Sequence, residues 1–208
     1  MQHYPGVRAF RDEGVTANAA FGPGSIAAVE PQTPRERLEA AEREMQAALL
    51  SELLDRVRSI APDAFEQLIV DLLVKMGYGG SRSEAARRLG RSGDGGVDGI
   101  IREDALGLDA VYIQAKRYAE DNTVGAPAIQ GFAGALLGNG ATKGVFVTTS
   151  RFTAAARESI AAYRSHRIVL IDGAELAALM VQHEVGVRTI QTIRVQRVDL
   201  ESYEEDET

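Results

Sequence analysis

The fold is decided by two neighbouring stretches, Val97-Asp-Gly-Ile-Ile-Arg102 and Asp109-Ala-Val-Tyr-Ile-Gln-Ala-Lys-Arg-Tyr118. Both are rich in β-branched and aromatic residues, which favour strands. The segment that joins them, Glu103-Asp-Ala-Leu-Gly-Leu108, is typical of a turn. We therefore predict two adjacent strands that run antiparallel.

Two helices are predicted before these strands. Thr33-Pro34-Arg35-Glu36 supplies an N-cap, a proline at the first helical position and a capping-box glutamate, and a helix-favouring sequence continues to about Ser59. A second helix should begin at Pro62 and end at Gly77 to Gly80. Its apolar residues are spaced for one buried face: Phe65, Leu68, Ile69, Leu72, Leu73 and Met76.

Helices and strands alternate after the two strands. We predict helices over 126–137, 153–164 and 174–183, and buried strands over 144–149 and 167–171. This order predicts an α/β domain with a mixed β-sheet flanked by helices, antiparallel early in the chain and parallel late. The expected organisation is an irregular lead-in (1–32), a helical linker (33–60), the main domain (61–190) and a C-terminal strand with an acidic tail (191–208).

Composition limits the classes of site. Hydrophobic residues make up 45% of the 208 residues and charged residues 25%, as in ordinary globular proteins. Cysteine is absent and the three histidines are scattered, which excludes disulfides, thiol nucleophiles and Cys/His zinc sites. Any metal must be held by oxygen ligands. No membrane span or signal peptide is apparent, so a cytoplasmic location is expected.

Side chains in the second strand alternate between two faces. One face, the core face, should carry Val111, Ile113 and Ala115. The other, a polar face, should carry Tyr112, Gln114 and Lys116. An ordinary half-exposed strand that ends in lysine is the alternative.

Asp98 is the first candidate for chemistry. It follows Val97 and precedes two isoleucines, so it lies at or inside a strand, where a carboxylate is costly unless a cation or hydrogen-bond donors satisfy it. Asp94, within Gly93-Asp-Gly-Gly96, is better explained by a tight turn. A dinucleotide-binding loop is disfavoured, because such a loop opens a helix and this one opens a strand.

Glu66 is the second candidate. Ile69, Val70 and Leu73 lie three, four and seven positions further along its helix, so its side chain leans onto an apolar face. Favourable placement near a helix N-terminus and a functional role are both open.

These residues together are suited to phosphodiester hydrolysis. Asp98 could bind magnesium, Gln114 could add its side-chain oxygen, and the Ala115 carbonyl is nearby. The Lys116 ammonium could orient water or stabilise developing negative charge.

The motif Gly-Gly-Val-Asp98-Gly-Ile-Ile followed by Tyr-Ile-Gln114-Ala-Lys116-Arg-Tyr resembles the Mrr-type restriction endonucleases of the PD-(D/E)XK nuclease superfamily. The resemblance extends over about 35–187, through stretches that begin at Phe65, Met76, Lys143 and Ile171. It implies a restriction-endonuclease-like fold, cleavage of double-stranded DNA with magnesium or manganese, and in many relatives a preference for methylated DNA.

By the same resemblance, Asp98 is the metal-binding aspartate, Lys116 the catalytic lysine and Glu66 the helix-borne acid. Gln114 stands where the wider superfamily has an acid, as in Mrr-type members. Because Gln114 is neutral, metal affinity should depend more on Asp98 and Glu66. Mrr-type enzymes usually pair the nuclease domain with an N-terminal winged-helix domain that reads DNA. No helix-turn-helix is visible in the roughly 60 residues before Pro62, so that function does not transfer.

Several further residues are candidate DNA contacts, each with a plainer alternative. The net charge of −7 conceals a basic segment with four arginines: Arg82, Arg87, Arg88 and Arg91. Gln130 matches a polar family position, although a solvated helix face also explains it. The hydroxyl groups of Thr148, Thr149 and Ser150 could donate to a phosphate, or could cap the helix that begins at Thr153.

Three functions are compatible with this sequence. A defence endonuclease is favoured, a repair or junction-processing nuclease on the same fold is an alternative, and a non-cleaving DNA-binding module is the third. The retention of Asp98 and Lys116 counts against the last. Because cutting two strands takes two sites or two visits, we expect a homodimer or a higher homo-oligomer, joined through the helix over 33–59.

Overall fold

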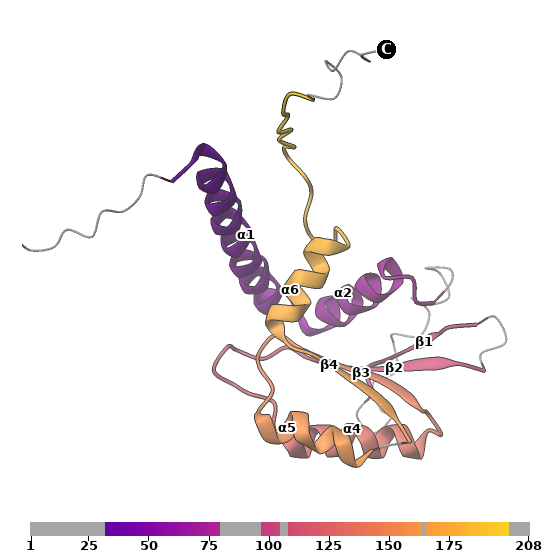
Figure 1. Cartoon of the computed structure of the whole chain (residues 1–208). Helices are drawn as coiled ribbons and strands as arrows, with labels where there is room; N and C mark the ends of the chain where they lie inside the picture. Colours follow the sequence, from indigo (N-terminus) through magenta and orange to yellow (C-terminus); the bar gives the residue numbers. More distant parts are fainter. Residues whose placement is uncertain (1–31, 80–96, 105–107, 164, 200–208) are drawn as a thin grey trace, which may run out of the picture. The chain divides into compact units, whose positions relative to one another are not determined.

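The computed structural model describes residues 32–79, 97–104, 108–163 and 165–199. Its elements follow one another in the order α1 (Pro34–Ser59), α2 (Pro62–Lys75), β1 (Gly99–Arg102), β2 (Ala110–Lys116), α4 (Ala126–Gly138), β3 (Lys143–Thr148), α5 (Ala154–Ser159), the 3-10 turn η1 (Ile160–Ala162), β4 (Arg167–Ile171) and α6 (Gly173–Gln182) (Figure 1). The lead-in, the turn around Asp94 and the arginines Arg82, Arg87, Arg88 and Arg91 lie outside the described residues.

The four strands form one sheet in the order β1-β2-β3-β4. β1 pairs antiparallel with β2, with Gly99 opposite Ile113. β2 pairs parallel with β3, with Lys116 opposite Thr148, and β3 pairs parallel with β4. The predicted mixed sheet is therefore confirmed: the antiparallel pair β1–β2 is consecutive in the chain, whereas helices lie between the parallel neighbours β2, β3 and β4.

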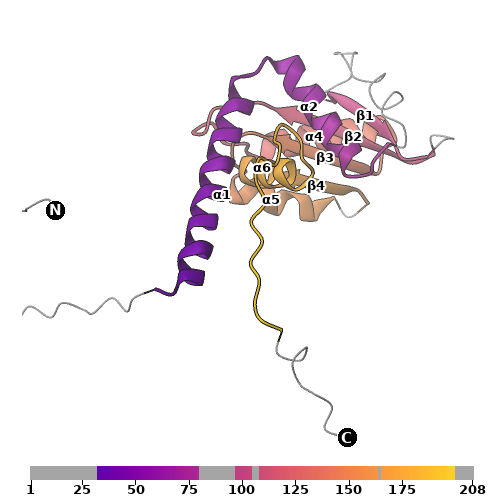
Figure 2. The same ribbon diagram turned by 90° about the horizontal axis from the view of Figure 1, so that it is seen from above.

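Helices cover both faces of the sheet. α2 and α6 lie over one face and α4 and α5 over the other (Figures 1 and 2). Two apolar cores result. The first contains Phe65, Ile69 and Leu73 of α2 with Val111, Ile113 and Ala115 of β2, and the second contains Ile129, Phe132 and Leu136 of α4 with Phe146 and Leu170 of the strands. Burial of this apolar surface is the main contribution to stability.

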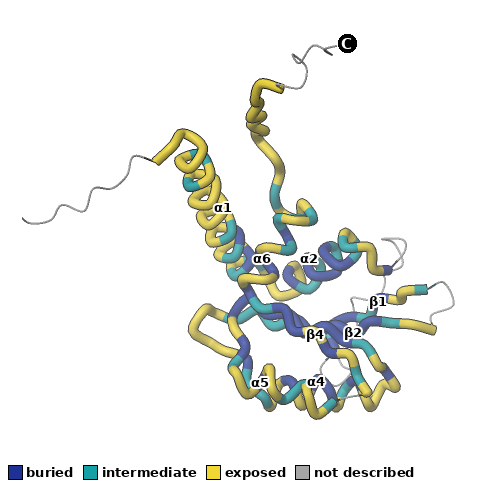
Figure 3. Tube along the Cα trace, in the orientation of Figure 1, coloured by how far each residue is buried: buried dark blue, intermediate teal, exposed yellow. Residues whose placement is uncertain are grey.

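The second face of β2 differs from the predicted polar face. Tyr112 packs against the core under α4, and Gln114 is only 3% exposed. The strands are dark along their central residues in Figure 3, which matches burial on both sides. The prediction was wrong because alternation within one strand does not reveal that a crossover helix covers its other face. Gln114 is thus a polar group in a covered layer, whereas Lys116, the last residue of β2, is half-buried.

α1 begins as predicted. Glu36 Oε2 accepts hydrogen bonds from the Thr33 backbone N–H at 2.7 Å and from its hydroxyl at 2.9 Å, while Thr33 Oγ1 accepts from the Glu36 N–H. This capping box fixes the first turn. Only Leu53 and Val57, near the other end of α1, are buried.

Two predicted elements differ from the structure. The helix expected over 153–164 ends after Ser159 and continues only as the turn η1. The C-terminal strand is wrong for residues 191–199, which have no regular secondary structure and are exposed. Ile193, Val195 and Val198 give this segment the composition of a strand, but a strand also needs a neighbour for its backbone hydrogen bonds.

Candidate active site

Asp98 is held across from Gln114 by the β1–β2 register. Its backbone N–H donates to the Ile113 carbonyl at 2.8 Å, which extends the antiparallel ladder by one residue beyond Gly99. Its Oδ2 accepts from Gln114 Nε2 at 2.5 Å and from the Ala115 N–H at 2.7 Å. Two donors therefore satisfy the half-buried carboxylate, whereas Oδ1 accepts no hydrogen bond from the described residues.

Gln114 and Ala115 place two more oxygens at this point. A carboxylate only accepts hydrogen bonds, so Gln114 must turn its NH2 group to Asp98, and its Oε1 accepts nothing from the described residues. The N–H and C=O of one strand residue point toward the same neighbour. Because the Ala115 N–H donates to Asp98, its carbonyl is directed to the Asp98 side of β2 as well.

Glu66 is brought to the same site by α2. The pKa of this half-buried carboxyl is raised, first by burial, then by the negative charges of Asp98 and Asp63, and Lys116 acts in the opposite direction. Glu66, Asp98 and Lys116 thus lie within electrostatic range of one another. The structure unites the four residues from α2, the start of β1 and the end of β2.

The donor set fits a hard divalent cation. It offers the Glu66 carboxylate, Asp98 Oδ1, Gln114 Oε1 and the Ala115 carbonyl, all of them oxygens, the ligands that magnesium and manganese prefer. Among the described residues no cluster of three or more Asp, Glu or His side chains could hold a metal by itself. A cation here would therefore use neutral oxygens, and it would relieve the repulsion between Glu66 and Asp98.

The three hydroxyl residues at the end of β3 and just after it have a role that differs from both predicted ones. Thr148, Thr149 and Ser150 are at most 1% exposed, and their hydroxyls donate to the carbonyls of Lys116 (2.9 Å), Tyr118 (2.7 Å) and Asn122 (2.7 Å), respectively. No hydroxyl hydrogen is left for a phosphate. Thr153 itself caps α5 by accepting from the Ala156 N–H. The three hydroxyls instead fix the chain that leaves Lys116.

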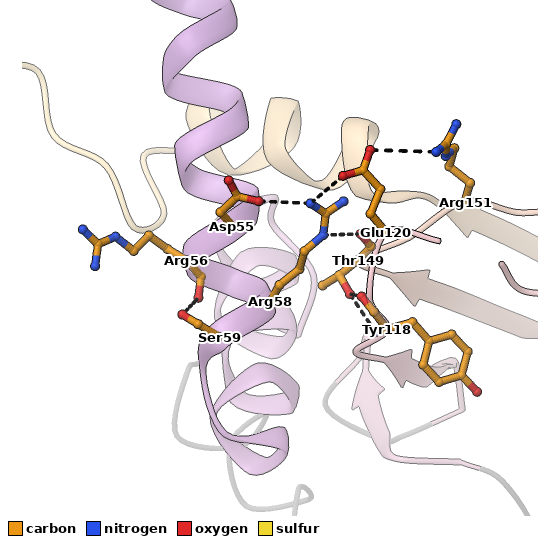
Figure 4. Close-up of polar contacts among 8 residues, drawn as sticks. All are labelled: Asp55, Arg56, Arg58, Ser59, Tyr118, Glu120, Thr149 and Arg151. Carbon is orange, nitrogen blue, oxygen red and sulfur yellow. Dashed lines mark hydrogen bonds and ion pairs between the residues drawn. The ribbon is translucent and has the colours of Figure 1, made fainter. Parts of the chain in front are cut away.

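Two arginines that sequence reasoning did not select also hold this chain, and Figure 4 shows one of them, Arg58. Arg58 of α1 donates through Nε to the Thr149 carbonyl at 3.3 Å, and Arg117 donates through Nη1 to the Arg58 carbonyl at 2.6 Å. Arg117 Nε is buried and has no hydrogen-bond partner among the described residues. Arg117 could have been noticed because it follows Lys116, but nothing local indicates Arg58.

Gln130 is exposed on α4 and its side chain forms no hydrogen bond with the described residues, so its contact with the site or DNA stays a prediction. No helix in the described part of the chain is long and apolar enough to cross a membrane.

An acid, an amide and a lysine on adjacent strands, at one end of a mixed sheet between helical layers, define the restriction-endonuclease-like class of fold. Residues 57–180 match the family model for the Mrr catalytic domain, described as a restriction endonuclease. This match covers more than half of the chain, and the chain belongs to that family. It is an enzyme domain of the nuclease class, similar to type IV restriction enzymes.

One curated relative is the type IV methyl-directed restriction enzyme EcoKMrr of Escherichia coli (strain K12). The two are 43% identical over 172 residues, which cover 83% of this chain and 55% of the relative. The chain thus spans about half the length of the curated relative that it matches.

Two solved structures share the fold. The DNA modification-dependent restriction endonuclease AspBHI aligns with a TM-score of 0.50 and 23% identity, over 76% of this chain and 38% of its own. The MspJI restriction endonuclease in complex with a 27-mer oligonucleotide aligns with a TM-score of 0.50 and 29% identity, over 76% of this chain and 36% of its own.

Proposed function

We propose that this protein is a magnesium-dependent endonuclease that hydrolyses phosphodiester bonds of double-stranded DNA and prefers modified, methylated DNA. The observation that carries the proposal is the convergence of Asp98, Gln114, Lys116 and Glu66 at one end of the β1–β2 pair. Oxygen donors for a cation stand there beside a lysine, which is the combination that phosphoryl chemistry needs.

Each residue has a defined task in this proposal. Asp98, Glu66, Gln114 and the Ala115 carbonyl would hold magnesium, or manganese in its place. When bound, the cation would supply positive charge at the scissile phosphate and lower the pKa of water. Lys116 donates to the phosphate as negative charge develops on its oxygens. Hydrogen bonds from Gln114 and Ala115 keep Asp98 from rotating away, so less reorganisation is needed when the cation binds.

The preference for methylated DNA rests on the relatives. EcoKMrr is described as methyl-directed and AspBHI as modification-dependent, and MspJI is seen with an oligonucleotide. The catalytic residues carry no information about the modification, since they act on the phosphate and not on the base. The preference for methylated DNA is therefore tested separately from cleavage itself, by comparing methylated with unmethylated plasmid.

The test uses supercoiled plasmid, methylated and unmethylated, incubated with the protein in magnesium, manganese or EDTA. We expect nicked and linear products only with a cation, faster on methylated plasmid. Asp98→Asn and Lys116→Ala should abolish cleavage but leave DNA binding measurable. Lys75→Ala, at an exposed lysine in the last turn of α2, is the matched control and should cleave normally.

Three outcomes would contradict the proposal. Cleavage that survives Asp98→Asn or Lys116→Ala would mean that another site acts. A branched junction cut in preference to methylated duplex would favour a repair nuclease. Binding without cleavage of any substrate by the unsubstituted protein would favour the non-cleaving module.

We also propose that the active form is a homodimer or a higher homo-oligomer. α1 leaves Met45 61% and Leu49 41% exposed, which gives this helix apolar surface for a second copy. Sedimentation velocity of the protein and of a Met45→Glu, Leu49→Glu variant tests this. A monomer at every concentration in both samples would contradict it.

A further inference from the structure

Two arginines from separate elements share the carboxylate of Glu120 (Figure 4). Glu120, in the loop after β2, places Oε2 3.4 Å from Arg58 Nη1 and Oε1 3.8 Å from Arg151 Nη2. Each oxygen of the carboxylate thus faces a different guanidinium group. A phosphodiester also presents two charged oxygens, and arginine is the residue best suited to bind it.

Arg58 is fixed before any ligand arrives. Its side chain is only 20% exposed, and its Nε donates to the Thr149 carbonyl while Nη1 also pairs with Asp55 at 3.1 Å. Because the guanidinium is already ordered, binding an anion in place of Glu120 costs little further side-chain entropy.

Arg151 and Glu120 are free to change partners. Their side chains are 70% and 67% exposed, and their separation of 3.8 Å is long for an ion pair. Exposed pairs of this kind contribute about 0–1 kcal/mol. Another anion can therefore displace Glu120 from Arg151 at a small cost in free energy.

The position of this cluster relative to Lys116 follows from Thr149. The Thr149 N–H donates to the Lys116 carbonyl at 3.3 Å, and the Thr149 carbonyl accepts from Arg58. A single residue therefore separates the proposed catalytic strand from the fixed guanidinium. A nucleic-acid strand that passes Lys116 would bring further phosphates past the arginine cluster.

We propose that Arg58 and Arg151 bind a backbone phosphate of the DNA next to the one that is cleaved, and that Glu120 occupies this site while DNA is absent. The inference rests on the proposed function, because it takes DNA as the ligand. Glu120 acts as an internal substitute for the phosphate. It lowers DNA affinity, since the incoming phosphate must displace it from both arginines.

The test measures binding of a fluorescent 20-base-pair duplex in EDTA, where no cleavage is expected, over a series of salt concentrations. Glu120→Gln is compared with Asp121→Asn, which removes the same charge from the next residue of the loop, an exposed aspartate with no ion pair among the described residues. We expect Glu120→Gln to tighten binding by roughly two- to fivefold more than Asp121→Asn does, as expected for release of an exposed ion pair.

Arg151→Gln should weaken binding and reduce the slope of log K against log salt by about one, since one phosphate contact is lost. Arg35→Gln, at an arginine with an 85% exposed side chain, is the matched control and should leave the slope unchanged. When Arg151→Gln is already present, the gain from Glu120→Gln should be smaller than in the unsubstituted protein but still larger than that from Asp121→Asn, because Glu120 then competes with the phosphate for Arg58 alone.

Equal effects of Glu120→Gln and Asp121→Asn would overturn the inference, as would an unchanged salt slope in Arg151→Gln. Either result, in a protein that still binds and cleaves DNA, leaves the proposed function intact. If the unsubstituted protein binds no DNA, the proposed function fails, and the inference fails with it.

Discussion

Asp98 Oδ2 accepts a hydrogen bond of 2.5 Å from Gln114 Nε2 across the β1–β2 pair. This contact gives a physical reason for an amide at position 114. An acid there would face the Asp98 carboxylate, and two negative charges would share a site in which Gln114 is 3% exposed. An amide at position 114 offers the metal one negative charge fewer than an acid would. It does, however, donate a hydrogen bond to Asp98 before any metal binds.

Gln114→Glu should therefore destabilise the metal-free protein. We expect a loss of about 1–3 kcal/mol in EDTA, because a buried hydrogen bond is replaced by repulsion between carboxylates. Magnesium should restore more of the melting temperature in this variant than in the unsubstituted protein. Gln130→Glu makes the same chemical change on the exposed face of α4. Equal melting temperatures of the two variants in EDTA would contradict the expectation.

Glu66→Gln should stabilise the metal-free protein at neutral pH. Burial, Asp98 and Asp63 raise the pKa of Glu66 in the folded state, so the folded protein binds the proton more tightly than the unfolded chain does. The penalty for an ionised Glu66 is absent below the ordinary glutamate value of 4.5 and fully present above the raised folded value.

Melting temperatures in EDTA at pH 4.5 and pH 7.5 check this. The gain in melting temperature from Glu66→Gln should be smaller at pH 4.5, because Glu66 is then largely protonated in the folded protein. Glu158→Gln on the exposed surface of α5 is the control. A divalent cation should then stabilise the unsubstituted protein more than Glu66→Gln. A variant less stable than the unsubstituted protein at neutral pH would count against the placement of Glu66.

Thr149→Val should destabilise the fold although it preserves side-chain shape. Thr149 Oγ1 donates to the Tyr118 carbonyl and accepts from the Tyr118 N–H at 2.8 Å, and Thr149 is fully buried. We expect a loss of about 1–3 kcal/mol, measured by urea unfolding, because two backbone groups lose their partner. Thr123→Val, at an exposed threonine, should change stability little.

Gly173→Ala and Gly131→Ala should have opposite effects. A Cβ at Gly173 would lie 2.6 Å from the Thr149 carbonyl oxygen and 2.9 Å from its carbon, atoms of the backbone that Arg58 also contacts. We expect a loss of about 1–3 kcal/mol. A Cβ at Gly131, inside α4, meets nothing within 4 Å, so alanine should add roughly 0.5–1 kcal/mol there. Thermal unfolding of both variants tests these expectations. Equal changes in melting temperature would contradict the close approach of α6 to Thr149.

The amino-acid sequence alone determined the order of the elements and the antiparallel pair that carries Asp98 and Gln114. These features depend on local properties: β-branched residues between turn signals, and a capping box at Thr33 that starts α1 as predicted. Asp98 and Lys116 could be selected because a carboxylate inside a strand and a lysine on the next strand are unusual where the surrounding residues are apolar.

Only the tertiary structure decided which atoms meet. Arg58 and Thr149 are 91 positions apart, and no local pattern predicts that the end of α1 donates to the chain after β3. Helix packing also buried the second face of β2 and assigned the hydroxyls of Thr148, Thr149 and Ser150 to backbone carbonyls. Local sequence sets backbone conformation through short-range sterics and hydrogen bonding. The partners of a side chain depend on how distant elements pack, and that is determined by the whole core.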